Sequence, residues 1–285
     1  MKKMKKYIWL IMLLLVVATG AEAKKHKQLV ILHTNDTHSC ILPLKESLAD
    51  TVIAGRGGFI RRIAMIKEQR KEHPKNLLLF DSGDFSQGSS YYTMFKGDVE
   101  IGLMNRMGYD AVTIGNHEFD FGLENMARVF KMAKFPIVCA NYDFTGTVCE
   151  GLVKPYVVLK RNGVRIGVFG LGAKLQGLVS ARNCPGVKFL DPTETARKMV
   201  DILRNQEKCD VVICLSHLGW EVTDIPDEKV IGETRGIDIV LGGHSHTYMK
   251  EVQWAKNLDG KQVPDDQNGK HAVFVGKLVV DLYSK

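Results

Sequence analysis

Short runs of apolar residues, rich in Val, Ile and Leu, recur along the chain and predict β-strands. Continuous runs of this kind indicate strands that are buried on both faces, as in sheets that helices cover. We expect strands at 29–32, 77–80, 111–114, 137–140, 164–170, 211–215, 237–241 and 273–282.

Segments with the apolar spacing of amphipathic helices lie between many of these runs. They are found at 58–72, 99–107, 123–134 and 192–206. Alternation of strands and helices is typical of an α/β fold. The chain has no internal repeat and no linker, and we expect the polar stretch 257–270 to be a loop. The pattern therefore predicts a single α/β domain.

The first 23 residues have the pattern of a secretory signal peptide. A lysine-rich start at 2–6 precedes an apolar run at 7–18, and small residues lead up to Ala23. The run is shorter than the roughly 20 apolar residues that a membrane-spanning helix needs. We therefore expect cleavage after Ala23, export to the periplasm or the extracellular space, a mature domain at 24–285, and no membrane span after processing.

The composition is that of a globular protein with a hydrophobic core. Of 285 residues, 45% are hydrophobic and 25% are charged, which excludes collagen, low-complexity disorder and polytopic membrane proteins. Six cysteines are too few for a disulfide scaffold. Part of the formal net charge of +7 comes from the lysines of the predicted signal peptide, and no basic cluster follows residues 24–27. We therefore expect no nucleic-acid partner.

Polar residues follow five of the predicted strands at the point where each strand ends. Because ligand sites of α/β proteins lie at the carboxyl ends of strands, we expect these residues to converge. Taken singly, each has an ordinary reading as a turn, a helix cap or a core residue. Together they are ligands suited to divalent transition metals. They are Asp36, His38, Asp84, Asn116, His117, His217, His244 and His246.

The spacing of these residues suits two metals. Asp36 and His38 are two positions apart, and so are His244 and His246. On extended chain, residues two apart point the same way, so that each pair can chelate. Two cations about 3.5–4 Å apart favour phosphoester hydrolysis. The remaining histidines are expected to be surface or structural residues: His26, His33, His73 and His271.

The order of the motifs resembles that of the calcineurin-like metallophosphoesterase superfamily. The motifs are D-x-H, G-D, G-N-H-E, an isolated His after a strand, and G-H-x-H. Four longer motifs resemble, more narrowly, the catalytic N-terminal domain of periplasmic 5′-nucleotidases and UDP-sugar hydrolases. They are LHTNDTH at 32–38, GGFIRR at 57–62, DSGDFSQGS at 81–89 and GNHEFDFG at 115–122. The resemblance implies mixed β-sheets sandwiched by helices, in four α/β/β/α layers.

The resemblance also implies a role for each residue. Asp36, His38 and His246 would hold one divalent metal. Asn116, His217 and His244 would hold the other, and Asp84 would bridge them. His117 would be the catalytic histidine, with Asp120 fixing its ring and raising its basicity. The metals can be Zn, Mn, Fe, Co or Mg, because these ligands accommodate all of them.

We therefore expect a 5′-nucleotidase-type phosphomonoesterase, in which a metal-bridging hydroxide attacks the phosphoryl group of a nucleotide and releases phosphate. Three alternatives remain open. One is a phosphodiesterase or pyrophosphatase acting on 2′,3′-cyclic nucleotides or UDP-sugars. The second is a broad-specificity phosphatase, and the third is a binding module with a structural metal site.

Substrate recognition is a separate question, because full-length 5′-nucleotidases of this kind carry a second, C-terminal domain that contacts the nucleotide. Nothing in this sequence matches that domain. Three accounts are open: low selectivity, a separate partner chain that carries the C-terminal domain, or recognition by this chain's own loops at 40–55 or 171–187. We favour the partner chain.

Overall fold

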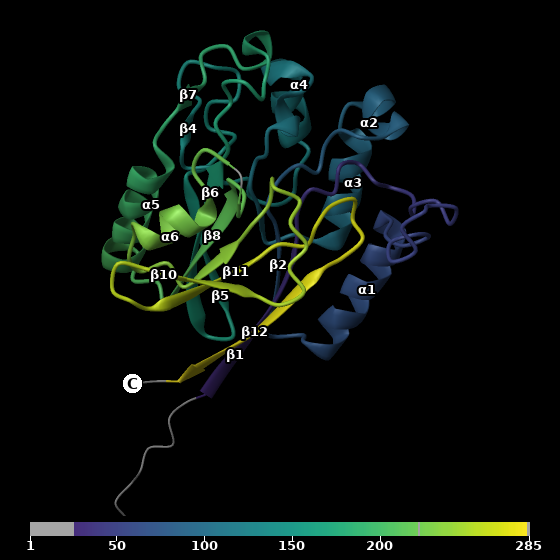
Figure 1. Ribbon diagram of the computed structural model, residues 1–285. Helices are drawn as coiled ribbons and strands as arrows, with labels where there is room; N and C mark the ends of the chain where they lie inside the picture. The colour runs from purple at the N-terminus through teal and green to yellow at the C-terminus, as the bar shows by residue number, and fades with distance from the viewer. Residues whose placement is uncertain (1–25, 222, 284–285) are drawn as a thin grey trace, which may run out of the picture.

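Two β-sheets packed face to face form the middle of the molecule (Figure 1). The structure is a computed structural model that describes residues 26–221 and 223–283. The predicted signal peptide at 1–23 lies outside the described residues. Within the part described, no helix is both long enough and apolar enough to cross a membrane.

The first sheet has four strands and the second has six. The first has the order β12–β1–β2–β3, with β1 at His26–Thr34, β2 at Leu77–Asp81, β3 at Ala111–Val112 and β12 at Gly276–Tyr283. The second has the order β10–β11–β9–β8–β6–β5, with β5 at Tyr156–Arg161, β6 at Val164–Gly172, β8 at Val211–His217, β9 at Ile239–Leu241, β10 at Gln253–Lys256 and β11 at Gln262–Asp266. A small pair, β4 (Tyr142–Asp143) and β7 (Lys188–Phe189), lies apart from both.

Parallel and antiparallel pairs are mixed in both sheets. In the first sheet β1 pairs in parallel with β2 and antiparallel with β12. In the second, β6, β8 and β9 run parallel, whereas β5 and β10 pair antiparallel with their neighbours. The parallel strands bring their carboxyl ends to one edge of each sheet.

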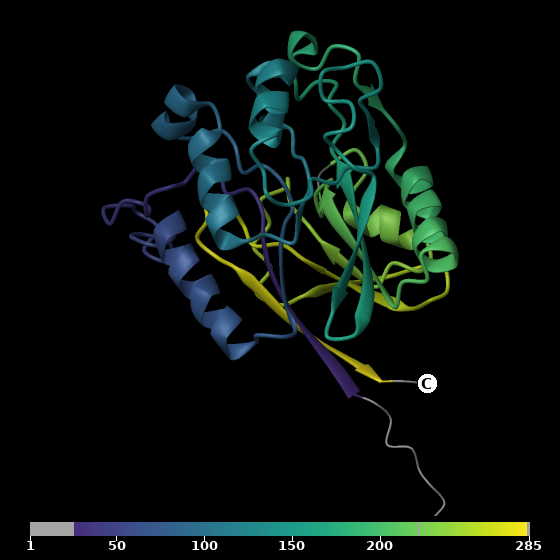
Figure 2. The same ribbon diagram turned by 180° about the vertical axis from the view of Figure 1, so that it is seen from behind.

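Helices cover the outer face of each sheet. The first sheet is covered by α1 (Phe59–Glu72), α3 (Asp98–Met107) and α4 (Gly122–Phe130), and the second by α5 (Pro192–Asp201) and α6 (Asp227–Gly232). Figure 2 shows the two sets of helices on opposite sides of the sheets. Shorter elements are α2 (Ser90–Phe95), η1 (His117–Phe119), η2 (Ala181–Asn183) and η3 (Ile202–Gln206).

Alternating side chains of the strands fill three hydrophobic layers. In β1, Leu29 and Ile31 face the other sheet, whereas Val30 and Leu32 pack against helices. This is the two-residue period of a strand that is buried on both faces. The predicted four-layer α/β/β/α sandwich is therefore confirmed.

Local sequence explains where α5 begins and how it ends. The side chain of Asp191 accepts the N–H of Glu194 at 2.8 Å, and Pro192 occupies the first turn, where its missing N–H costs nothing. The predicted helix at 192–206 is found, but its last part is the π-helix η3. Pattern reasoning missed α2 and α6, because each has only six residues.

The predicted strand at 137–140 is wrong as a ladder-forming strand. Val138 N–H donates to the carbonyl of Val112 in the first sheet, whereas Ala140 N–H donates to Gly170 in the second. The segment therefore crosses from one sheet to the other and forms only isolated bridges. The predicted loop at 257–270 is also partly wrong, because it contains β11.

We predict that replacing Ile213, which is fully buried between the sheets, by Ala will lower the free energy of unfolding by about 2–5 kcal/mol, because the change leaves a cavity in close-packed surroundings. Urea denaturation measures this loss. Val279→Ala on β12 is the matched control, since that side chain is 53% exposed. Similar losses in both variants would contradict the assignment of this layer as core.

Candidate metal centre

The loops that follow β1, β2, β3, β8 and β9 meet at one edge of the two sheets. Six of the seven predicted metal ligands, together with His117, form three overlapping groups. The seventh predicted ligand, Asn116, precedes His117 in the chain. Within each group the candidate ligand atoms lie within 4.8 Å of one another. The groups are Asp36 with His38 and His246, His38 with Asp84 and His117, and Asp84 with His217 and His244. Asp84 and His38 each belong to two groups, so the groups form one continuous centre.

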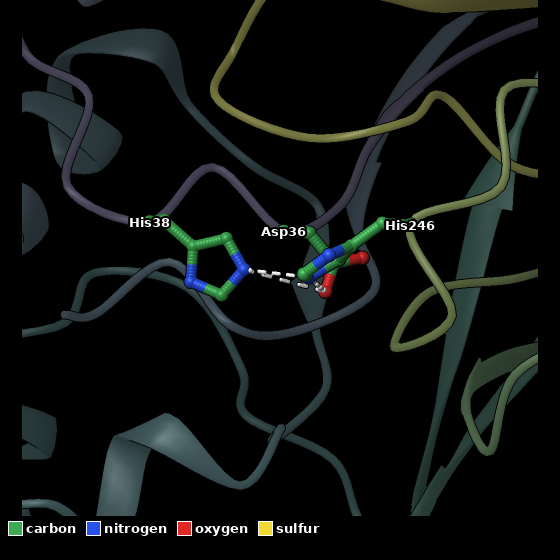
Figure 3. A group of neighbouring side chains, drawn as sticks. All are labelled: Asp36, His38 and His246. Carbon is green, nitrogen blue, oxygen red and sulfur yellow. Dashed lines mark hydrogen bonds and ion pairs between the residues drawn. The ribbon is translucent and has the colours of Figure 1, made fainter. Parts of the chain in front are cut away.

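The first group joins the loop after β1 to the loop after β9 (Figure 3). Nε2 of His38 lies 2.9 Å from Nε2 of His246, and Nε2 of His246 lies 3.3 Å from Oδ1 of Asp36. Burial lowers the pKa of His38 to about 4, so its ring is neutral at neutral pH. Two imidazole nitrogens and a carboxylate oxygen therefore converge on one point, as the ligands of a divalent cation do.

The group of Asp84, His217 and His244 depends on the orientation of His217. Its Nδ1 lies 2.6 Å from the carbonyl oxygen of Ser82, which can only accept, so Nδ1 carries the proton. Nε2 then faces Oδ2 of Asp84 at 3.2 Å. Burial alone would lower the pKa of His217, but the Asp84 carboxylate outweighs it and raises that pKa to about 10. A carbonyl that fixes the tautomer of a ring in this way is typical of metal-ligating histidines.

His244 belongs to the same group as His217, and Asn116 is the remaining predicted ligand. The rings of His217 and His244 are 5.1 Å apart, and burial lowers the pKa of His244 to about 4. Oδ1 of Asn116 and Nε2 of His217 are buried and have no hydrogen-bond partner among the described residues. Buried polar atoms are seldom left unpaired. The donor set therefore fits a divalent metal ion.

His117 lies beside this centre and is about one-third exposed. Its Nδ1 is 3.1 Å from Oδ2 of Asp120, and its backbone N–H donates to Oδ1 of Asp84 at 2.9 Å. Burial would lower the pKa of His117, but the hydrogen bond to Asp120 and the Asp84 charge raise it. With Nδ1 held by Asp120, Nε2 is left free for proton transfer.

Close packing of main chain against Asp84 holds the bridging position. A Cβ added at Gly115 would lie 2.2 Å from Oδ1 of Asp84, so only glycine fits there. Glu118, which the motif contains but sequence reasoning gave no role, accepts the N–H groups of Asp84 and Gly115 at 3.0 and 2.7 Å. Its buried carboxylate thereby joins the loops after β2 and β3.

Two further residues that sequence reasoning missed position the loops. Gln267 is fully buried, accepts the N–H of Thr247 at 2.6 Å and donates to the carbonyl of Gly243 at 2.9 Å, and so closes the loop that carries His244 and His246. The side-chain amide of Asn35 donates to Oδ2 of Asp36 at 2.6 Å and to Gly269 at 2.8 Å. Neither residue has a recognisable sequence signal, since both contact main chain that is distant in sequence.

The histidines outside the predicted ligand set have different surroundings. His33 is fully buried, and its Nε2 lies 2.9 Å from Oδ2 of Asp266, so it is a structural residue as expected. His271 lies next to the centre instead, with its ring 6.0 Å from that of His38. Its backbone N–H donates to the carbonyl of Asp36 at 2.8 Å.

Comparison with known proteins gives consistent matches. The family model described as calcineurin-like phosphoesterase matches residues 29–248. The 5′-nucleotidase of Rattus norvegicus is 33% identical over 97% of this chain and 50% of its own length, and that of Homo sapiens is 34% identical over 90% and 46%. The chain thus spans about half the length of these curated relatives.

Solved structures agree with these sequence matches. A 5′-nucleotidase precursor from Thermus thermophilus superposes with a TM-score of 0.80 at 33% identity, over 89% of this chain and 51% of that one. An NAD nucleotidase from Haemophilus influenzae has a TM-score of 0.78 at 27% identity, over 90% of this chain and 48% of that one.

A pair of buried acids beneath the centre generates a prediction on pH. Burial raises the pKa of Asp227 to about 7 and that of Asp265 well above its usual range, and the charge of Asp227 raises the pKa of Asp265 further. In the unfolded chain both lose their protons near pH 3.9. The folded state therefore binds protons that the unfolded state has released, and stability falls as the pH rises from about 4 through 7.

We predict that Asp265→Asn will flatten this dependence, by about 1.4 kcal/mol for each pH unit over which one proton differs. Urea denaturation between pH 5 and 8 with a chelator present measures it. Asp201→Asn, at an exposed position, should keep the wild-type slope. Equal slopes in the wild type and Asp265→Asn would refute the raised pKa of Asp265.

Proposed function

Because this chain belongs to the calcineurin-like phosphoesterase family, we propose that it is a metal-dependent phosphoester hydrolase that releases phosphate from nucleotides. The observation that carries this proposal is the place of Asp84, which shares one group of candidate ligands with His217 and His244 and another with His38, itself a member of the group of Asp36 and His246. One carboxylate between two cations is suited to phosphoryl transfer to water.

The assignment of ligands follows the grouping of side chains. We propose that Asp36, His38 and His246 hold one metal ion. Asn116, His217 and His244 would hold the other, and Asp84 would contact both. The neutral rings of His38 and His244 and the unpaired oxygen of Asn116 support this assignment. The residue types accept Zn, Mn, Fe, Co or Mg.

The protein's own residues supply positioning and a proton. When bound, the two metal ions lower the pKa of water and neutralise phosphate oxygens. Asp120 holds Nδ1 of His117, so Nε2 of His117 faces the centre and protonates the departing oxygen. The charge of Asp84 keeps His117 close to the reaction through its backbone N–H.

Nucleotides are the substrate class that the relatives' names support, since several are 5′-nucleotidases. Those relatives are about twice as long as the matched region. We propose that a domain corresponding to their unmatched half adds to nucleotide binding, including the case in which a separate chain carries it. We further propose that the protein is exported, on the basis of the leader pattern at 1–23.

Chromatographic analysis of the products tests the substrate class, because 5′-AMP gives adenosine and phosphate, 2′,3′-cyclic AMP gives AMP, and UDP-glucose gives UMP and glucose 1-phosphate. With Mn²⁺ or Zn²⁺ added, 5′-AMP should be hydrolysed with a higher kcat/KM than 2′,3′-cyclic AMP or UDP-glucose. A higher value for the cyclic nucleotide or the UDP-sugar would favour the phosphodiesterase or pyrophosphatase alternative.

We predict that Asp84→Ala and His117→Ala will separate metal binding from proton transfer. Asp84→Ala removes the group that both metal sites share, so it should lower the metal content of both and abolish activity. His117→Ala should retain its metals and lose about 10²–10⁴-fold in kcat, the usual contribution of general acid catalysis. Elemental analysis and phosphate release measure the two effects.

Asp259→Ala serves as the control for these variants, because Asp259 is exposed and pairs with Arg235 and not with a candidate ligand. It should match the wild type in both measurements. Equal metal loss in Asp84→Ala and His117→Ala would refute the division of roles.

A further inference from the structure

A cavity opens beside His38, whose ring contacts that of His117. It has a volume of about 320 Å³ and lies between the loop at 38–44, the loop at 88–91 and His271. This volume is within the range of pockets that take small molecules. The rings of His38 and His117 are in edge-to-face contact, with centroids 5.3 Å apart. A group that leaves next to His117 therefore has this cavity close by.

The walls of the cavity suit a planar, partly apolar group. Tyr91 and His271 contribute two half-buried rings, and Leu42 and Leu44 contribute aliphatic side chains. The hydroxyl of Ser90 adds a hydrogen-bonding group at the same wall. Aromatic and aliphatic walls with a few polar groups are typical of pockets for small organic ligands, and aromatic walls favour planar rings.

The backbone holds His271 in place at an energetic cost. His271 and Ala272 both have left-handed backbone conformations, with φ of 62° and 61°, which residues other than glycine seldom adopt. The backbone N–H of His271 donates to Asp36, and Gly57 packs against the carbonyls of residues 271 and 272. Strained residues that the surroundings hold in place cluster at functional sites.

A second cavity, of about 340 Å³, reaches the centre from the other side. It is lined by His244 and by Lys174, whose Nζ lies 3.5 Å from Asp224. Neither His117 nor Asp120 lines either cavity. The ring of His244 contacts that of His217, whereas the ring of His38, which lines the first cavity, contacts that of His117.

We propose that the cavity beside His38 binds the nucleoside portion of the substrate, with His271 and Tyr91 in contact with it. His271 is thereby a specificity-determining residue for the leaving group. This inference rests on the proposed function, and it assigns part of nucleotide recognition to the chain's own loop at 38–44.

The test compares two esters with chemically similar leaving groups. 5′-AMP and glycerol 3-phosphate are both esters of primary alcohols, so a difference between them reports binding of the nucleoside. His271→Ala should lower kcat/KM for 5′-AMP by about tenfold or more, which is the lower end of what one pocket contact contributes. Its kcat/KM for glycerol 3-phosphate and its metal content should stay within about twofold of wild type.

Two further variants sharpen the result. His271→Phe retains a ring and should recover most of the loss on 5′-AMP. Lys174→Ala, in the second cavity, should leave the ratio of the two esters unchanged. A selective loss on 5′-AMP in Lys174→Ala, with none in His271→Ala, would overturn the proposal.

Adenosine binding, measured by calorimetry, does not depend on turnover. The wild type should bind adenosine, and His271→Ala should raise the Kd for adenosine by about tenfold. If the wild type hydrolyses both esters but His271→Ala changes neither measurement, the cavity assignment is wrong and the proposed function stands. If the wild type hydrolyses neither ester, the proposed function fails, and adenosine binding unaffected by His271→Ala would then remove the cavity assignment as well.

Discussion

The buried carboxylate of Asp84 is the group on which the arrangement of the centre depends. It accepts the backbone N–H of His117 and lies 3.2 Å from Nε2 of His217, so it contacts loops from two other strands. A buried charge is tolerated only when polar partners surround it at close range. The main chain at Gly115 passes too near for any side chain. One negative charge thus sets how closely the loops after β2, β3 and β8 approach.

Much of the fold could be predicted because its strands are buried on both faces. The runs at 77–80 and 211–215 are apolar throughout, and each lies within a strand that is buried along its length. The segment at 137–140 has the same composition but crosses between the sheets. The apolar composition of a segment predicts that it is buried, but it does not predict which strand it pairs with. Elements of few residues, such as α6, give too short a pattern to recognise.

The candidate site divides in the same way. Asp36, His38 and the G-H-x-H pair could be predicted, because chemistry restricts the residue type at a ligand position and strand ends restrict the place. The extended backbone expected at these two pairs is wrong, since all four residues have positive φ angles of 43–72°. Gln267 could not, since an amide that binds main chain obeys no spacing rule. The place of His271 beside His38 could not be predicted for another reason: it depends on two consecutive left-handed residues, which leave no pattern in the sequence. Supporting residues are therefore visible only once distant segments have come together.

The pairing of β1 with β12 joins the two ends of the described chain, with His26 opposite Tyr283. β1 carries the loop of Asp36 and His38, and until β12 is added its outer edge has no partner in the sheet. β12 is the last of the described strands to be synthesised. The sheet that supports half of the centre therefore closes only after nearly all of the described residues are available, and such long-range contacts form slowly. The stretch made first cannot complete its sheet ahead of the rest of the domain.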